Sequence, residues 1–458
     1  MDGFSLQILK KVPLAQATFR VLSFALDDGL LDAIYEEHRG KTYTKIITFP
    51  LITRLVCDAL FQDKSGRRVF ENARQEKTLA ASVEAAYKKL GRVPVAVSTA
   101  FLEGTSARIR ELFPQGCEET ALPASLAHFS GIVVDGKATK QIPHRLKPLR
   151  TEKVGGLVGG RGLVAHHLQS GLVLGMEADE DGDANETPWV PKLVQKVRRD
   201  NPGPRLWIAD RQFSYPSSLA EFGRDDDAFV VRYSKAIPFF PDESRESRAG
   251  QDAEGRDFVE EWGWLGVTRH PLRRYVRRIS VQRSGKEAVI VATSLLDAEQ
   301  YPATDLLEAY RCRTNIEYVF ERITEVFALR RLIGTSPRAT VFQLSLCLVM
   351  YNVLHLVRAY IARANRKPLS RVSPKKLLED IREQMTSCLV ILEVEALTAC
   401  LSKSGTIDEM KKFLAKTLHV WESRWIKAKP QRNRPETPLR QRCHDSVFRV
   451  LQRAKANQ

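Results

Sequence analysis

A series of short apolar segments between residues 128 and 234 limits the possible folds more than any other feature of the chain. The segment HFSGIVVDGKATKQI predicts an apolar strand, an Asp-Gly turn and a second strand, and GLVAHHLQSGLVLGMEAD predicts another pair of strands. A helical segment, the buried strand RLWIAD, a second helical segment and the strand AFVVRYS follow in that order.

This order of elements predicts the fold class. Three strands in series, then helix, strand, helix and strand, and then a further helix, is the order of a ribonuclease H-like core. Such a core is an α/β fold whose mixed sheet has helices on both faces. We assign residues 126–235 to the first part of this core and residues 304–360 to its last helices. Between them, residues 236–303 are rich in turns and strand-like segments and predict a β-rich insertion.

The charge balance points to a polyanionic partner. Lys and Arg number 71 against 55 Asp and Glu, a net charge of +16. This charge favours nucleic acid over a membrane surface, and by itself it leaves a merely soluble basic protein equally open. The seven scattered cysteines include no CxxC pair, which fits reduced thiols in a cytosol, and the N-terminus lacks a signal-peptide pattern. We therefore expect a cytoplasmic protein without a membrane partner.

Both ends of the chain predict helices. Residues 1–125 form a helical N-terminal domain, for which DNA-end binding and a role in interaction or dimerisation stay equally open. Residues 361–458 continue as a helical C-terminal region with a basic tail, which has ten Lys or Arg against three acids from residue 421 onward. Polar residues interrupt the apolar stretch 341–357, which predicts a buried core helix rather than a membrane span.

Three acidic residues are the candidate catalytic groups. Asp135 ends the apolar run in IVVDGK, and Asp210 ends the run in LWIADRQF. Glu317 lies in YRCRTNIEYVFERITEVF, a stretch that we interpret as one helix with an apolar stripe and a polar stripe. The apolar stripe contains Ile316, Phe320, Ile323 and Phe327, and the polar stripe contains Tyr310, Arg313 and Glu317.

Carboxylates in this arrangement suit a divalent-metal site. Mg²⁺ prefers hard oxygen ligands, and two ions about 3.5–4 Å apart can stabilise both the attacking and the leaving oxygen of a phosphodiester. Taken singly, each acid has an ordinary structural interpretation, since Asp135-Gly136 suits a hairpin turn and Asp210 suits a helix N-cap. The three acids together, each at the end of a suitable element, favour the metal site.

These segments resemble those of the DDE transposases of bacterial insertion sequences. The resemblance is to the cut-and-paste group with a Tyr-x2-Arg-x3-Glu-x6-Lys signature, the insertion-sequence-four family. VVDGK and IADRQF are similar to the segments around the first and second catalytic aspartates, and YRCRTNIE places Tyr310, Arg313 and Glu317 at the family spacing. The likeness spans about residues 130–360. One position departs, because the signature lysine falls at Thr324, which is not basic.

The resemblance implies a transposase that binds terminal inverted repeats and catalyses metal-dependent DNA cleavage and strand transfer. Asp135, Asp210 and Glu317 would hold two Mg²⁺ ions, or Mn²⁺ in their place, while Tyr310 and Arg313 would position phosphates. The partners would be double-stranded DNA, both transposon ends and target, with a homodimer on the paired ends and a place on the bacterial nucleoid. Two alternatives stay open: a ribonuclease H-like nuclease without strand transfer, and a catalytically decayed DNA-binding protein.

The insertion supplies further candidate DNA contacts. The resemblance implies a tryptophan that stacks on a flipped base, and Trp262 and Trp264 lie two residues apart in a strand-like segment, on one face. Core packing of the insertion is at least as good an interpretation of either ring. Residues 269–286 hold seven Lys or Arg and no acid, which predicts a strip that binds the DNA backbone, or an edge protected by charge. The arginines named for this role are Arg273, Arg274, Arg277 and Arg278.

Overall fold

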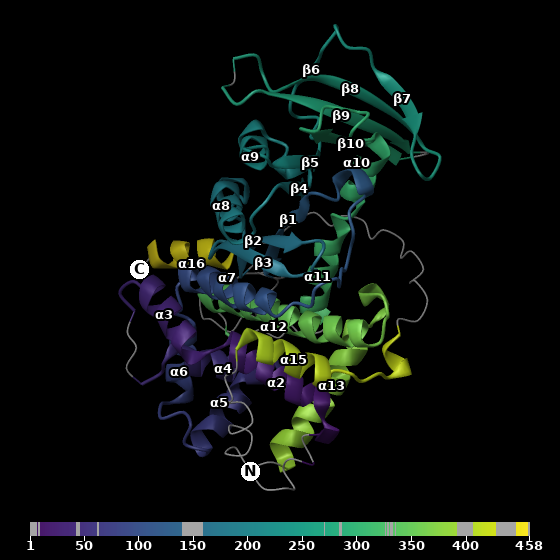
Figure 1. The fold of residues 1–458 in the computed structure, drawn as a ribbon. Helices are drawn as coiled ribbons and strands as arrows, with labels where there is room; N and C mark the ends of the chain where they lie inside the picture. Colours follow the sequence, from purple (N-terminus) through teal and green to yellow (C-terminus); the bar gives the residue numbers. More distant parts are fainter. Residues whose placement is uncertain are drawn as a thin grey trace.

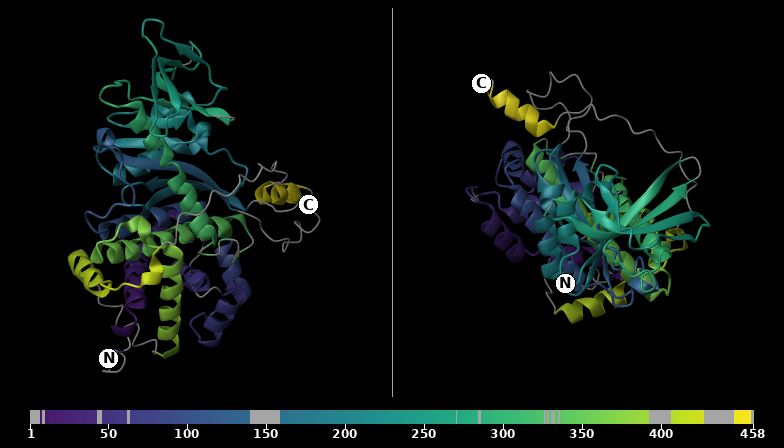
Figure 2. Two further views of the ribbon diagram at one scale, coloured as in Figure 1. Left: turned by 90° about the vertical axis from the view of Figure 1, so that its right-hand side faces the viewer. Right: turned by 90° about the horizontal axis from the view of Figure 1, so that it is seen from above.

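The fold has a mixed sheet at its centre, with the β-rich insertion at one end and a layer of helices at the other (Figure 1; Figure 2). The computed structural model describes residues 7, 10–42, 46–61, 64–139, 159–269, 271–283, 286–325, 327, 329, 333–334, 336–391, 406–426 and 446–456. All structural statements below concern these residues.

The core strands form one side of the sheet. They are β1 (Ser130–Thr139), β2 (Gly160–His167), β3 (Val173–Asp179), β4 (Arg205–Ala209) and β5 (Ala228–Arg232). Their order is β3-β2-β1-β4-β5, in which β3, β2 and β1 pair antiparallel while β1, β4 and β5 pair parallel. The predicted α/β mixed sheet is therefore present, and its strand order is consistent with a ribonuclease H-like core.

The strand β1 is continuous, and the predicted Asp-Gly turn was wrong. β1 pairs with β2 from Ile132 to Thr139, so Asp135 and Gly136 lie inside the strand. Burial on both faces favours continuation over a turn, since Ile132 and Val134 belong to one hydrophobic cluster and Val133 to the other. Gly136 does not have a positive φ angle, which a primed hairpin turn would require.

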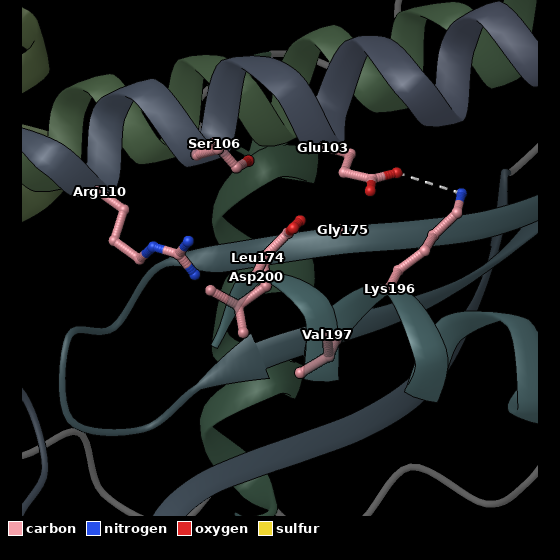
Figure 3. A pocket seen from close by; sticks show the side chains of 9 residues that line it. Glu103, Ser106, Arg110, Leu174, Gly175, Lys196, Val197 and Asp200 are labelled. Atoms are coloured by element: carbon pink, nitrogen blue, oxygen red, sulfur yellow. Dashed lines mark ion pairs between the residues drawn. The ribbon is translucent and has the colours of Figure 1, made fainter. Parts of the chain in front are cut away.

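Helices cover both faces of the core strands, as the sequence predicted. Helices α8 (Val190–Asp200) and α9 (Pro216–Phe222) share a hydrophobic cluster with one face, while α7 (Val95–Glu111), α11 (Thr314–Glu325) and α12 (Pro337–Ala364) share the other cluster. At the edge strand β3, α7 and α8 lie close enough for Lys196 to pair with Glu103, 3.4 Å away, and with Glu177, 2.6 Å away. Figure 3 shows the Glu103–Lys196 pair beside a small cavity that is lined by residues of α7, β3 and α8. The two helices thus cover part of the sheet edge.

The terminal helices form one layer below the sheet. The N-terminal helices are α2 (Pro13–Ala25), α3 (Asp28–His38), α4 (Phe49–Phe61), α5 (Gly66–Gln75) and α6 (Val83–Leu90), and the C-terminal ones include α13 (Pro374–Ile391) and α15 (Ile407–Thr417). Residues from both ends belong to a single hydrophobic cluster with α12. The backbone amides of Leu14 and Ala15 both donate to the Gln384 side chain, at 2.9 and 3.2 Å. The described residues of both ends are thus largely helical.

The helix α12 is the central buried element of this layer. Among the described helices it alone has the length and composition to cross a membrane, and its most apolar window is 100% buried inside the protein. The polar Gln343, Asn352 and His355 are buried with it and hydrogen-bonded, Asn352 to both backbone groups of Val173. The most apolar part of this helix therefore packs inside the protein, as expected of a core helix.

The predicted insertion is β-rich and extends the core sheet. It contains β6 (Phe239–Pro241), β7 (Arg248–Gln251), β8 (Asp257–Leu265), β9 (Arg274–Arg283) and β10 (Lys286–Thr293). β10 pairs antiparallel with β5, so the order continues as β5-β10-β9-β8-β6, and β7 pairs with the other part of β8. Helix α10 (Ala303–Arg311) then leads into α11.

The end of the predicted basic tail is an ordered helix, α16 (Val447–Ala456), beside the acidic loop that follows β3. The Ser446 amide donates to Asp183 at 3.0 Å, and the Arg449 guanidinium donates to Asp181 at 2.9 Å. Val447 and Val450 are buried. Residues 427–445 of the tail lie outside the described residues.

Candidate active site

The strand register brings Asp135 and Asp210 together. Val134 of β1 is the register partner of Ala209 of β4, and the two strands run parallel. Asp135 is the next residue of β1 and Asp210 directly follows β4, so both lie at the same edge of the sheet. The sequence placed each aspartate after an apolar run, and the pairing of β1 with β4 makes them neighbours.

The same edge carries a third charged residue, Arg232, which the sequence did not identify. Ala209 of β4 pairs with Val231 of β5, so Arg232 stands beside Asp210, and its Nη1 lies 3.9 Å from Asp210 Oδ1. The signal was available, because Arg232 ends the buried run AFVVR and Asp210 directly follows the buried run RLWIA.

The segment that carries Glu317 is two helices, and the prediction of one helix from Tyr310 was wrong. α10 ends at Arg311 and α11 begins at Thr314. The break is a tight turn in which the Cys312, Arg313 and Asn315 amides bond to carbonyls three residues earlier. The Thr314 hydroxyl also donates to the Arg311 carbonyl at 3.0 Å, a local bond that competes with α-helical pairing.

Helix α11 nevertheless presents the predicted faces. Ile316, Phe320 and Ile323 are buried, while the Glu317 side chain is 52% exposed on the other side. Arg313, in the turn before the helix, connects Glu317 to the strand edge. Its Nη2 lies 2.7 Å from Glu317 Oε1, and its Nη1 lies 3.6 Å from Asp135 Oδ2. The turn therefore lets one guanidinium contact both acids.

Burial and neighbouring charges shift the protonation of this group. Burial raises the pKa of Asp135 to about 6, against the opposing effects of the Gly136 amide and Arg313, and the nearby Asp210 and Glu186 raise it further. Burial and Asp210 raise the pKa of Tyr310 to about 12. For Arg313, burial lowers the pKa, but the surrounding carboxylates outweigh it and the net shift is upward. Arg313 is thus a permanent cation among carboxylates that repel one another.

The residues fit a divalent cation in donor chemistry. Asp210 Oδ1 is buried and has no hydrogen-bond partner in the described structure, although Arg232 lies 3.9 Å away. Asp135, Asp210 and Glu317 supply only hard oxygen donors, as Mg²⁺ prefers. In the described part of the chain, no three His, Cys, Asp or Glu side chains stand close enough together to hold an ion. Asp135, Asp210 and Glu317 therefore lie at the same edge of the sheet, but their carboxylates are not close enough together to share one ion.

Comparison with known families identifies this region. Residues 129–353 match the family model described as a transposase DDE domain. This region of the chain is therefore similar to a transposase DDE domain. The match includes Asp135, Asp210, the insertion and the Glu317 helix, and it supports a transposase.

Other comparisons add little to the domain match. Among solved structures, piggyBac transposase in a synaptic complex with hairpin DNA is similar at 12% identity and a TM-score of 0.41. The alignment covers 85% of this chain and 84% of that chain. No curated protein matches the chain. The assignment therefore rests on the DDE domain itself.

The two tryptophans of the DDE domain insertion have different surroundings. Strand alternation places both on one face of β8, but Trp262 is 2% exposed and its Nε1 donates to the Leu296 carbonyl at 2.9 Å. Trp264 is 41% exposed and packs edge-on against Tyr275, with the Arg273 guanidinium 4.8 Å from its ring centroid. Of the two, only Trp264 presents an accessible ring in this structure.

The arginines of the predicted basic strip likewise differ in burial and in their partners. The Arg277 side chain is fully buried and paired with Glu260, and Arg278 pairs with Glu261 at 2.5 Å. Arg274 donates to the Ala220 carbonyl at 3.2 Å, and Arg273 lies over the exposed Trp264 ring. Acidic partners on β8 thus neutralise part of the strip, which its own sequence could not show.

Position Thr324, where the signature lysine would fall, turns toward its own helix. Its hydroxyl donates to the Phe320 carbonyl at 2.6 Å. Lys137 of β1, two residues after Asp135, brings a cation to the same part of α11, with its Nζ 5.2 Å from the Phe320 ring centroid. The sequence contained this residue in IVVDGK, but only the packing of α11 on β1 shows what it faces.

Two basic cavities flank Arg232. One of about 450 Å³ is lined by Tyr310, Arg313, Arg311 and Arg256, and one of about 170 Å³ is lined by Arg211 and Lys235, with Arg232 in both linings. Glu287, an acid in the lining of the smaller cavity, is paired with Lys235 at 2.9 Å. Both cavities are suited to anionic groups beside the acidic edge.

Proposed function

We propose that this chain is a transposase of the insertion-sequence-four type, which binds the terminal inverted repeats of its element, cleaves DNA and joins the freed end to target DNA. One observation carries the proposal. Within the region similar to a DDE domain, Asp135 of β1 lies beside Asp210, which directly follows the neighbouring parallel strand β4, and Arg313 pairs with both Asp135 and Glu317.

Asp135, Asp210 and Glu317 are the residues that would hold two Mg²⁺ ions, or Mn²⁺ in their place. When bound, such ions activate water or a 3′ hydroxyl and stabilise charge on the leaving oxygen. The chain itself supplies the three carboxylate ligands and sets the distances between them. Arg313 offsets the mutual repulsion of the carboxylates until cations arrive, because it contacts two of them.

The cationic side chains around this edge position the DNA backbone. Arg232 and Arg313, with the Tyr310 hydroxyl, line the larger cavity beside the acids and would hold phosphates there. Lys137 would supply the contact that Thr324 does not, since its ammonium lies over the same turn of α11. Arginine forks favour bidentate phosphate contacts, which fix the scissile bond relative to the acids.

The insertion and the tail extend the DNA contact. Arg273 and the exposed ring of Trp264 form one surface at the end of the insertion, suited to backbone contact and base stacking. Arg274 and Arg278 lie nearby, but both have partners within the protein. Trp262 and Arg277 are buried, so these two side chains support the surface from within. The basic tail adds backbone contacts, and a homodimer would hold the two element ends together.

Cleavage of a labelled duplex that carries the inverted repeats flanking the gene tests the proposal. The protein should cut the repeat end in Mg²⁺ but not in EDTA, and join the cut end to a second duplex. Asparagine at Asp135 or Asp210 should abolish both steps and leave binding in EDTA intact. Cutting without joining would identify a nuclease, and binding without cutting by the unaltered protein would identify a decayed DNA-binding protein.

A further inference from the structure

We infer that Glu186 is a positioning residue of the candidate active site, whose carboxylate holds together the two strand ends that carry Asp135 and Asp210. The inference rests on the proposed function, because it concerns the same site. It assigns a role to a residue outside the three acids and the DNA contacts.

Glu186 is an unusually buried member of an acidic loop. It ends the segment EDGDANE between β3 and α8, yet it is only 4% exposed. Its carboxylate pairs with Arg161 of β2, and Arg161 also donates to the Ala184 carbonyl at 3.1 Å. Removing two charges from water is costly, and the opposite charge of Arg161 offsets part of that cost for the buried Glu186 carboxylate. The loop thus directs one of its acids into the protein.

The carboxylate lies directly against the backbone beside Asp135. A Cβ added at Gly136 would stand 2.0 Å from Glu186 Oε1 and 2.1 Å from its Cδ, so only glycine leaves room. Glycine is required here because a Cβ would overlap the Glu186 carboxylate. The backbone conformation does not require it, since the φ angle of Gly136 is not positive. The Gly136 amide in turn donates to Asp135 Oδ1 at 2.8 Å. Glu186 therefore fixes the peptide that orients the Asp135 carboxylate.

The second carboxylate oxygen reaches the Asp210 segment. The Gln212 side-chain amide donates to Glu186 Oε2 at 2.6 Å. Gln212 lies in the short 3-10 turn η4 (Arg211–Phe213), which Asp210 begins as its N-cap residue. The Glu186 carboxylate thus pairs with Arg161 through Oε1 and accepts a hydrogen bond from Gln212 through Oε2. It also lies against the backbone of Gly136.

This bridge lies where the sheet itself stops joining the two strands. The register between β1 and β4 ends at Val134 and Ala209, one residue before each aspartate. Beyond that point Glu186 supplies a link through side chains. Residues that orient metal ligands without touching the ion typically change ion affinity or activity by about 10–100-fold when substituted. The arrangement assigns this type of effect to Glu186.

The test compares Glu186→Gln with Asp380→Asn in the full-length protein. Asp380 is an equally buried carboxylate, 4% exposed, that pairs with Arg424 and accepts from Trp425 Nε1 at 2.6 Å, in the helical layer. In metal-free protein, Glu186→Gln should speed hydrogen exchange at residues 132–137 and 208–214 together. Calorimetric titration with Mn²⁺ and with Mg²⁺ should show binding about 10–100-fold weaker. Asp380→Asn should leave both quantities at wild-type values.

A second variant separates positioning from folding. Gln212→Ala removes only the link to the Asp210 segment, so it should speed exchange at residues 208–214, spare residues 132–137 and still weaken ion binding. Wild-type exchange at both segments in Glu186→Gln, or wild-type ion affinity in both variants, would overturn the inference. If unaltered protein binds no ion, the proposed function fails, whereas the paired exchange measurement still decides whether Glu186 joins the two strand ends.

Discussion

Asp135 and Asp210 stand side by side because each is the first residue beyond a paired position of two adjacent parallel strands, Val134 on β1 and Ala209 on β4. Their separation is therefore set by the spacing between strands, about 4.8 Å, and not by the loops between them. Glu317 has no such constraint, because it lies on helix α11 and not on a strand of the sheet. Its side chain is connected to the site by an ion pair with Arg313. The two aspartates form the fixed part of the site and Glu317 the adjustable part.

Replacing Glu317 with Gln should abolish DNA cleavage and leave the fold intact. The side chain is 52% exposed, so loss of its ion pair with Arg313 should cost at most about 1 kcal/mol of unfolding free energy. A neutral amide is a poorer ligand for hard cations, so the cleavage rate should fall by about 100-fold or more. Thermal unfolding, binding in EDTA and end cleavage in Mg²⁺ measure the three quantities. Glu321→Gln, an exposed acid one turn later on α11, is the control and should cleave normally; normal cleavage by Glu317→Gln would refute its assignment.

Replacing Gly136 with Ala should destabilise the protein by about 1–3 kcal/mol, because the new methyl group overlaps the Glu186 carboxylate. In a Glu186→Ala background the same change should cost much less, since the obstructing group is gone. Urea unfolding of the four proteins gives the coupling. Gly175→Ala on β3 is the matched control, as its Cβ would meet no atom within 4 Å. Equal costs in both backgrounds would show that Gly136 and Glu186 are not in contact.

The arginines of the insertion should separate into stabilising and DNA-binding residues. Arg277→Gln should reduce stability by roughly 3–5 kcal/mol, because it leaves Glu260 buried without its cation. Arg273→Gln should leave the melting temperature within error but lower DNA affinity on all sequences, reducing the slope of log affinity against log salt by about 1. Melting curves and salt titrations of duplex binding measure both. A loss confined to the repeat sequence in Arg273→Gln would indicate base recognition instead.

Acid should destabilise the protein below about pH 6.5 through its buried histidines. Burial lowers the pKa of His166 and His167 to about 4 and that of His355 to about 3. Below their ordinary value of 6.5, the unfolded chain binds protons that the folded chain does not, so stability falls as the pH decreases from 6.5 towards 4. The expected total is on the order of several kcal/mol, measurable by urea unfolding at each pH. His166→Leu should flatten this dependence, and substitution of the exposed His128 by Gln should not; an unchanged slope in His166→Leu would contradict the explanation.

Several features followed from the sequence because their causes are local. Alternation with period 2 and period 3.6 marked the strands, the helices and the buried face of α11, and the apolar run before Asp210 marked the end of β4. The apolar stretch 341–357, interrupted by a few polar residues, likewise predicted a buried core helix. Such patterns survive folding because each element must bury its own apolar face.

Tertiary structure alone decided what depends on distant partners. The Asp-Gly pair continues the strand because β2 pairs with β1 through both residues, and the polar Thr314 helped to break the helix after Arg311. Trp262 and Arg277 are buried while Trp264 is exposed, because the residues that cover or pair with them lie on other strands. Glu186 and Arg232 join the site through strand register and loop packing. The residue types were visible in the sequence, but burial and pairing arise between segments far apart in the chain, and no local pattern records them.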